Sequence, residues 1–237
     1  MLLIKQHLPW LVSFVLAVCI VVGYYSIAPV HSMLVTVYQR VTGDYGLPPP
    51  VHITFIEGTT VSDYSERSAR SFQNVSVESF LEAAKGQDGY LFPDTYFFQP
   101  SADAVEIVAR MRSNFDTKIA TLEPDIRASG HSLSDIVTMA SIIEGEASST
   151  VDRHMVSGIL WNRLALEMPL QVDVARETYT HKGFPNAPIN NPSLDALDAA
   201  VSPTKTSYLY YLTGNDGLMH YATTFAGHQA NLRKYLR

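Results

Sequence analysis

The chain contains one cysteine, Cys19, among its 237 residues. A single cysteine excludes a disulfide framework within the chain and a zinc site built from cysteines. Lysine and arginine number 17 against 23 aspartates and glutamates, which argues against a nucleic-acid-binding protein, because phosphate contacts need clustered cations. The sequence has no HExxH metal motif, no GxSxG motif and no phosphate-binding loop. We therefore expect no metal ion, no cofactor and no nucleic-acid partner.

The composition is otherwise that of a folded protein. Hydrophobic residues make up 46% of the chain and charged residues 17%. That balance allows a buried core and excludes a disordered chain, a coiled coil and collagen. The length is that of one or two domains.

The first thirty residues differ from all the others. No residue from Leu8 to Ala28 is charged, and about 20 residues at ~1.5 Å per residue span the hydrocarbon core of a bilayer. Trp10 lies near one end of this run and Tyr24 near the other, as aromatic residues do at membrane interfaces. Lys5 adds positive charge on the N-terminal side, so the positive-inside rule predicts a cytoplasmic N-terminus and an exported remainder.

Two alternatives to a retained anchor stay open. A cleaved signal peptide would have a shorter apolar core and small residues at its exit. A lipid-modified Cys19 is disfavoured, because Val18 precedes it and the apolar run continues beyond it. We predict a single-pass anchor within residues 1–30.

The exported part divides into three stretches. Residues 31–50 look like a linker that ends in Gly-Leu-Pro-Pro-Pro, residues 51–88 form a strand–helix–helix subdomain, and residues 89–237 form a larger domain. Helices come first and a β-hairpin comes late, so the sequence predicts an α+β fold. The predicted elements are a strand at 52–55, helices that start after Thr60 and Ser76, helices at 102–122, 133–147, 152–164 and 194–200, strands at 208–212 and 220–224, and a closing helix at 228–236.

The segment from Val137 to Ala147 carries the candidate chemistry. Its apolar residues form a buried stripe at helical spacing, comprising Ile136, Met139, Ala140 and Ile143. Glu144 lies at the edge of this stripe in the last helical turn, where burial and the negative helix end disfavour an ionised carboxylate. A protonated glutamate is what a general acid requires. Glu146 is roughly 200° further round a continuous helix, and the alternative is that both acids are solvated surface groups.

The residues from Ala140 to Ala147 resemble the signature of the YceG-like endolytic murein transglycosylases (the MltG family). Seven further blocks resemble family motifs in the same order, at 56–60, 89–96, 162–164, 168–173, 187–192, 208–210, and 220–224 with His228 and Asn231. The resemblance covers Val51 to Leu236.

This resemblance implies an enzyme that cleaves peptidoglycan glycan strands internally, between MurNAc and GlcNAc, and leaves 1,6-anhydroMurNAc ends. It also implies a LysM-like subdomain at 51–88, and an anchor in the bacterial inner membrane with a periplasmic catalytic domain at 89–237. A role in ending glycan polymerisation follows, with peptidoglycan synthases and division or elongation proteins as expected partners. By the same resemblance, the catalytic glutamate falls on Glu144 and the second signature acid on Glu146.

Other matched residues are candidates for substrate binding or support. We expect Gln171 and Asp173 to line the glycan cleft or orient Glu144, the alternative being a hydrogen-bonded turn. Tyr90, Tyr96 and Tyr179 are candidates for stacking on sugar faces, although core packing is the more frequent role of such aromatics. Further supporting candidates are Glu146 and Asn162, while His228 is expected to be a structural hydrogen-bonding residue.

The chain also departs from the family pattern. Gly145 stands between the two acids, where the family has lysine or a similar residue, and we expect it to loosen or end the helix just past Glu144. A stretch expected between Ala175 and Thr178 is missing. Two alternatives therefore stay open: an inactive glycan-binding or scaffold member of the family, and a true glycoside hydrolase that pairs Glu144 with Asp173 or Glu146.

Overall fold

The computed structural model describes residues 34, 36, 37 and 49–236. The chain forms two compact units, Met1–Pro49 and Pro50–Arg237, and the elements described here belong to the second unit. The predicted anchor at residues 1–30 lies outside the described residues. Among the residues that are described, none forms a helix long and apolar enough to cross a membrane.

The second unit begins with a two-stranded antiparallel sheet that is closed by two helices. Strand β1 (Val51–Thr54) pairs with β2 (Thr95–Phe98), and α3 (Val61–Ser71) and α4 (Val77–Ala83) lie between them in sequence. Both helices start at capping boxes, on Thr60 and Ser76, as the sequence predicts. The sequence predicted no element at residues 95–98, which form β2 and complete a β–α–α–β order.

The first part of the second unit, from β1 to β2 (residues 51–98), shares its core with the helix that follows it. Its cluster of buried residues runs from Ile53 through Phe80 and Tyr96 to Met111 in α5 (Ala104–Ala120). The cluster therefore extends beyond residue 88, where we expected the small subdomain to end. The long helix predicted at 102–122 is α5, and a turn after Ala120 leads into a further short helix, α6 (Glu123–Ser129), that the sequence did not predict.

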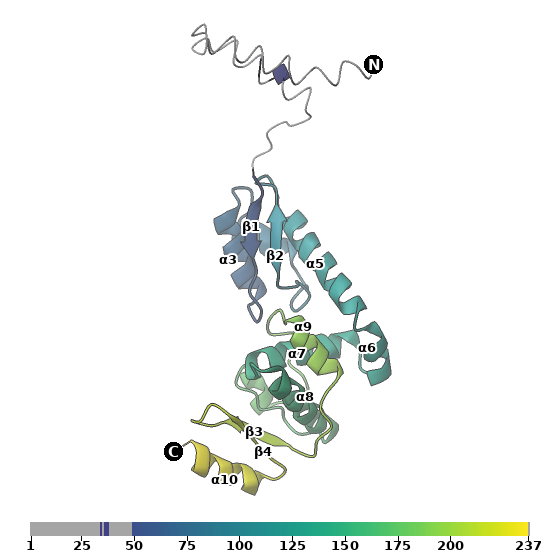
Figure 1. Ribbon diagram of the computed structural model, residues 1–237, viewed down its shortest axis with the longest axis vertical. Helices are drawn as coiled ribbons and strands as arrows, with labels where there is room; N and C mark the ends of the chain where they lie inside the picture. The colour runs from purple at the N-terminus through teal and green to yellow at the C-terminus, as the bar shows by residue number, and fades with distance from the viewer. Residues whose placement is uncertain (1–33, 35, 38–48, 237) are drawn as a thin grey trace, which may run out of the picture. The chain divides into compact units, whose positions relative to one another are not determined.

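The second core surrounds α7 (Leu133–Glu146), which α8 (Thr150–Ala165) and α9 (Leu194–Val201) contact (Figure 1). The predicted N-cap, Ser132, forms a capping box with Asp135. As expected, the helix ends just past Glu144: its last residue is Glu146, one position after Gly145. A Cβ atom at Gly145 would lie 2.7 Å from Cγ1 of Val174, so the glycine allows a neighbouring loop to approach the helix closely.

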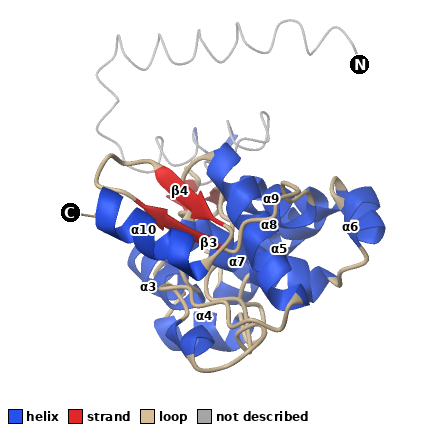
Figure 2. Cartoon of the chain, turned by 90° about the horizontal axis from the view of Figure 1, so that it is seen from below, coloured by secondary structure: helices blue, strands red, loops and turns tan. Residues whose placement is uncertain are grey.

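The last part is a hairpin followed by a helix. Strands β3 (Tyr210–Thr213) and β4 (Met219–Ala222) pair antiparallel, and α10 (Phe225–Tyr235) contacts both (Figure 2). The helix starts three residues before the predicted position, because Thr224 caps it. A short 3₁₀ helix, η2 (Arg176–Tyr179), lies in the loop-rich region before α9. Helices with two small antiparallel sheets confirm the α+β prediction.

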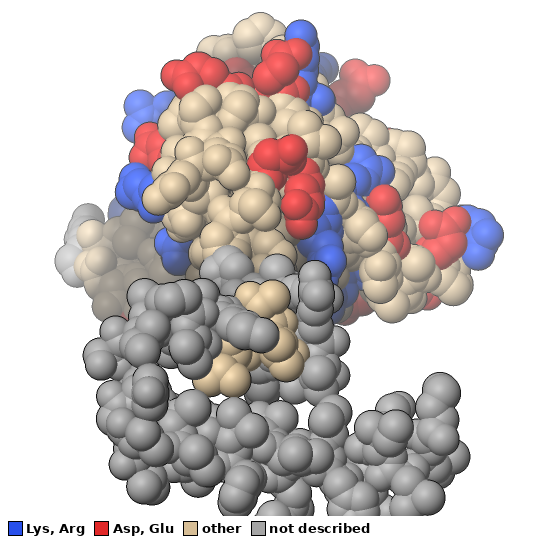
Figure 3. Space-filling model, turned by 90° about the horizontal axis from the view of Figure 1, so that it is seen from above, with Lys and Arg blue, Asp and Glu red and all other residues tan. Residues whose placement is uncertain are grey.

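Charged residues do not segregate by sign on the surface that Figure 3 shows. Acidic and basic side chains of the described residues are interspersed there. This view agrees with the near balance of charges in the sequence.

Candidate active site

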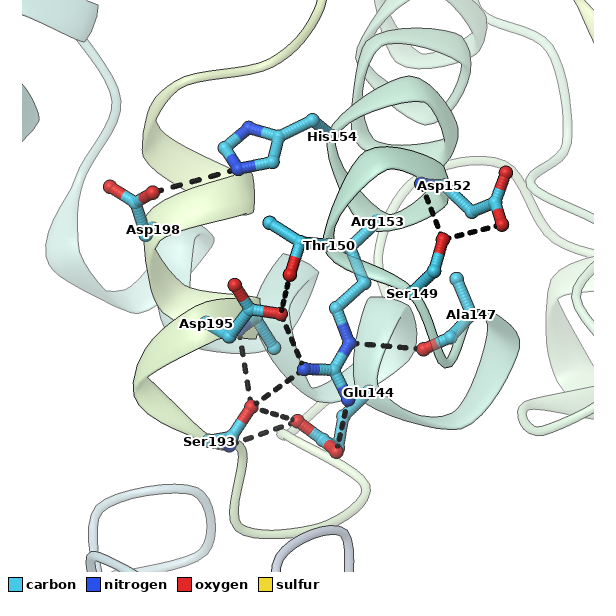
Figure 4. A network of polar contacts seen from close by, with 11 residues as sticks. Glu144, Ala147, Ser149, Thr150, Asp152, Arg153, His154, Ser193, Asp195 and Asp198 are labelled. Carbon is cyan, nitrogen blue, oxygen red and sulfur yellow. Dashed lines mark hydrogen bonds and ion pairs between the residues drawn. The ribbon is translucent and has the colours of Figure 1, made fainter.

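The end of α7 presents its two acids to different surroundings. Oε1 of Glu144 accepts a hydrogen bond of 2.9 Å from Nη2 of Arg153. Oε2 accepts a bond of 3.0 Å from the backbone N–H of Ser193 and a second bond from the hydroxyl of that serine (Figure 4). The side chain of Glu144 is only 7% exposed, so these donors take the place of water.

Arg153 holds this network together. Its Nε donates to the carbonyl of Ala147 at 3.0 Å, and its Nη1 donates to Asp195 at 2.8 Å (Figure 4). The guanidinium therefore joins the C-terminal end of α7 to the first turn of α9. Both carboxylate oxygens of Glu144 are thus held by donors from α8 and from the residue that caps α9.

The network also touches the first part of the unit. A Cβ at Gly58 would lie 3.3 Å from Cγ of Glu144, and the N–H of Gly58 donates to the carbonyl of Asn191 at 2.9 Å. Asn191 is fully buried and also accepts from the N–H of Leu91 at 3.1 Å. Burial, and next the nearby charge of Glu144, raise the pKa of Glu57 in the same turn. Three of the motif blocks, at 56–60, 89–96 and 187–192, thus meet near Glu144, although 132 residues separate Thr59 from Asn191.

Glu146 lies in a different environment. Its Oε2 accepts a hydrogen bond of 3.0 Å from the hydroxyl of Tyr211, whereas its Oε1 is buried and has no partner among the described residues. Burial raises the pKa of this carboxyl, against the opposing effects of the Tyr211 hydroxyl and of the nearby backbone N–H groups of Val174 and Asp173. A half-paired, desolvated acid of this kind is suited to exchange a proton with a ligand.

Glu146 lines a pocket of about 520 Å³, a size typical of ligand sites. Three residues predicted from the sequence, Gln171, Asp173 and Tyr179, line the same pocket. The hairpin and the closing helix supply the rest of the wall, with Tyr210, Tyr211, Leu212, Thr213, Phe225, His228, Leu232 and Leu236. Of this wall, the sequence motifs included only Tyr210, within the matched block at 208–210, and His228.

Arg163 is the buried cation of the pocket. It is 6% exposed and donates to the carbonyl of Leu209 at 2.6 Å and to the carbonyl of Leu170. Its guanidinium lies 5.3 Å from the centre of the Tyr210 ring. Burial lowers the pKa of Arg163, and the charge of Glu146 opposes that shift. This residue therefore positions two backbone segments around the acid.

Asp173 and Tyr179 form a pair at the mouth of the pocket. The hydroxyl of Tyr179 donates to Oδ1 of Asp173 at 2.7 Å, and the tyrosine is 47% exposed. An exposed aromatic ring at a pocket is suited to packing against a sugar face. This geometry agrees with the stacking role considered for Tyr179.

Three other candidates lie elsewhere. Tyr96 is 6% exposed and donates to the carbonyl of Phe92, so it belongs to the first core. Tyr90 packs edge-on against Phe115 at 5.1 Å. Asn162 donates to the carbonyl of Thr206 at 2.8 Å, which is a structural contact. None of the three lines the pocket that holds Glu146.

The described residues lack the ligand group of a metal site, and they include a second, smaller hollow. Within them, no group of three histidine, cysteine, aspartate or glutamate side chains is arranged to hold a metal ion. A smaller hollow of about 320 Å³ lies between β2 and α5, lined by polar residues that include Asp94 and Arg110. It contains neither acid of the α7 motif, so the larger pocket is the better candidate for chemistry.

Comparison with known proteins gives one family match and relatives that share a single name. Residues 3–177 and 176–234 match the model of the YceG-like family, and the match breaks where we expected a missing stretch. The chain is 30% identical over 172 residues to the endolytic murein transglycosylase of Bacillus subtilis, covering 63% of this chain and 48% of that protein. It is 27% identical over 177 residues to the protein of the same name from Streptococcus pneumoniae, covering 63% and 32%. The chain thus spans about half, or about a third, of these curated relatives.

A solved structure shares the fold. The crystal structure of a yceG-like protein from Listeria monocytogenes superposes with a TM-score of 0.71 at 24% sequence identity. The alignment covers 82% of this chain and 80% of the other.

Proposed function

Because this chain belongs to the YceG-like family, we propose that it is a membrane-anchored, endolytic lytic transglycosylase of peptidoglycan. It cleaves the bond between MurNAc and GlcNAc within a glycan strand and leaves a 1,6-anhydroMurNAc end. The observation that carries this proposal is the buried, half-paired carboxyl of Glu146 in a pocket walled by aromatic rings. The names of the bacterial relatives support the reaction class.

We assign the acid to Glu146 rather than to Glu144. Glu144 meets the family signature, but its two oxygens are occupied by Arg153 and Ser193 and it does not line the pocket. Glu146 meets the same signature two residues later, and its second oxygen is buried without a partner among the described residues, beside Tyr211. On this assignment, Glu144 holds α7, α8 and α9 together, which keeps the acid in position.

One acid is enough for this reaction. Glu146 donates its proton to the glycosidic oxygen as the bond from that oxygen to C1 of MurNAc breaks. The C6 hydroxyl of the same MurNAc then bonds to C1, and its proton passes to the carboxylate of Glu146. Water is not consumed, and the acid returns to its starting form. General acid–base catalysis of this kind is worth roughly 10²–10⁴ in rate.

The neighbours of Glu146 suit both halves of the cycle. Burial favours the neutral acid that must donate first. The Tyr211 hydroxyl and the positive charge of Arg163 stabilise the carboxylate that forms when the proton leaves. Tyr179 offers an exposed ring on which a sugar face can pack.

We also propose where in the cell the enzyme acts. The uncharged run from Leu8 to Ala28 supports an anchor in the bacterial inner membrane, with a cytoplasmic N-terminus and a periplasmic catalytic domain. A tethered enzyme would meet strands as they emerge, so we propose that it ends polymerisation beside peptidoglycan synthases and division or elongation proteins. The β–α–α–β order of β1 to β2 supports a LysM-like, glycan-contacting role for the first part.

The test is a digest of purified glycan strands by the full-length chain, with Glu146→Gln and Glu144→Gln as a matched pair. Products are identified by mass spectrometry. We expect anhydro-ended fragments, lighter than hydrolysis products by one water, and their loss in Glu146→Gln. Glu144→Gln should keep activity in proportion to the folded protein that remains. Loss in Glu144→Gln alone, with its fold intact, would return the acid to Glu144.

The same digest separates the alternatives. Asp173 lines the pocket with Glu146, so a second carboxylate is available to a hydrolase. Reducing ends in place of anhydro ends would identify that hydrolase. Binding of strands without cleavage would identify an inactive glycan-binding or scaffold protein.

A further inference from the structure

His228 is a polar residue of the pocket to which the reaction described above gives no task. It lies one turn into α10 and lines the same pocket as Glu146. Its ring stacks on Tyr210, with the ring centres 5.5 Å apart and the planes inclined by 26°. Phe225 also contacts it, at 6.4 Å between ring centres. The imidazole is therefore held in one orientation between aromatic side chains.

One nitrogen of this ring is unpaired. Nδ1 of His228 is buried and finds no hydrogen-bond partner within the part of the chain that the structure describes. A buried polar atom without a partner costs on the order of 1–3 kcal/mol. Such atoms are rare in folded proteins and call for a specific reason. Two residues that line the pocket, His228 and Glu146, thus each carry a buried polar atom without a partner among the described residues.

The charge state of His228 indicates which ligand groups could hydrogen-bond to its ring. Burial, and next the positive charge of Arg163, lower the pKa of the imidazole. The ring is therefore neutral at neutral pH, with one nitrogen that donates and one that accepts. A neutral group of this kind suits the hydroxyl and acetamido groups of an amino sugar, whereas an anionic ligand would favour the charged ring.

We propose that His228 is a substrate-binding residue, whose Nδ1 hydrogen-bonds a hydroxyl or acetamido group of the sugar that lies against Glu146. Tyr210 holds the imidazole in position for this contact, and the closing helix α10 thereby becomes one wall of the glycan site. The inference rests on the proposed function, because the sugar is the substrate of that reaction. It gives His228 a different role from the structural one that the sequence suggested.

The test compares two replacements of His228 in the full-length chain. His228→Phe keeps a ring against Tyr210 and removes the nitrogen, whereas His228→Asn places an amide close to the position of Nδ1. The control is His52→Phe, because His52 is exposed on β1, packs on Phe97 and does not line the pocket. The probe is peptide-free glycan strands, with binding measured in the Glu146→Gln background and turnover in the active chain.

We expect His228→Phe to raise KM and the dissociation constant about tenfold, the effect of one lost hydrogen bond. His228→Asn should recover most of that loss, although it is the smaller side chain. His52→Phe should match the parent in both measurements. Recovery by asparagine separates a polar contact from a packing role, since a packing role would favour phenylalanine.

Two results overturn the inference in different ways. If His228→Phe binds and cleaves strands like the parent while Glu146→Gln stops turnover, His228 does not bind the sugar and the proposed function stands. If the parent chain neither binds nor cleaves strands, the proposed function fails and the inference fails with it. Thermal melting of each variant identifies any loss that comes from unfolding.

Discussion

The hydroxyl of Tyr211 donates a hydrogen bond of 3.0 Å to Oε2 of Glu146, across 65 residues of sequence. This bond joins the β3–β4 hairpin to the last turn of α7 at the pocket. It favours the ionised form of Glu146, whereas burial favours the neutral form and is the larger effect. The balance of the two sets the pH range over which the acid can give up its proton.

Removing this bond should widen the active range toward alkaline pH. In Tyr211→Phe the carboxylate loses a donor, so the pKa of Glu146 rises further. A general acid works in its protonated form, and the alkaline fall of kcat/KM should therefore move to higher pH. The measurement is the pH profile of strand cleavage. Tyr179→Phe is the control, because its hydroxyl donates to Asp173 instead, and an equal shift in both variants would contradict the prediction.

Glu146→Gln should make the folded protein more stable at neutral pH. The pKa of Glu146 is higher in the folded than in the unfolded chain, so folding is penalised above the ordinary value of 4.5 and the penalty disappears below it. Glutamine removes the charge, so the gain should be present at neutral pH and absent in acid. Urea unfolding at both pH values measures it.

Glu78→Gln is the control for this prediction. The pKa of Glu78 is lowered in the folded chain, first by a bond to its own backbone and then by Ser76. Its replacement should therefore cost stability at neutral pH, the opposite sign. A stability gain from Glu146→Gln that persists in acid would have a cause other than the charge.

Gly145→Ala should impair activity although alanine is the better helix former. The added Cβ would lie 2.7 Å from Cγ1 of Val174, and relief requires the loop that carries Asp173 to move away from Glu146. A misplacement of about 1 Å at a reacting centre can cost on the order of 100-fold in rate. The rate of strand cleavage measures the loss.

The double variant Gly145→Ala/Val174→Ala tests whether the clash with Val174 causes the loss of activity. Trimming Val174 removes the clash, so most of the activity should return. If the double variant is as slow as the single one, the fault lies in the helix rather than in the loop. If Gly145→Ala is fully active, the close approach of Val174 has no functional importance.

Arg153→Met should destabilise the fold strongly. The arginine and Glu144 are 11% and 7% exposed, and removing one partner of a buried pair costs about 3–5 kcal/mol. Arg70→Met is the control, since its pair with Glu66 is 70% and 58% exposed and such pairs contribute about 0–1 kcal/mol. Denaturant unfolding gives both values. Equal losses would mean that the Glu144 network does not stabilise α7 against α9.

Local signals in the sequence were enough to predict most helices. Thr60, Ser76 and Ser132 each begin a helix whose first turn supplies the matching group three residues later, as the capping pattern predicts. Helix boundaries depend on neighbours along the chain, so a short window contains most of the information. Strand β2 was missed because a strand needs a partner, and β1 lies more than forty residues away.

The candidate site also has features that depend on neighbouring residues in the sequence and features that depend on distant ones. The sequence by itself determined that two acids end one amphipathic helix, and that aromatic and polar motifs accompany them in a fixed order. Only the tertiary structure decided which acid faces a pocket, because that depends on what packs against each side of α7. Arg153 and Ser193 occupy one side, and Tyr211, Arg163 and α10 enclose the other. Burial and pairing set the proton affinity of a carboxyl, and both arise from residues that are distant in sequence.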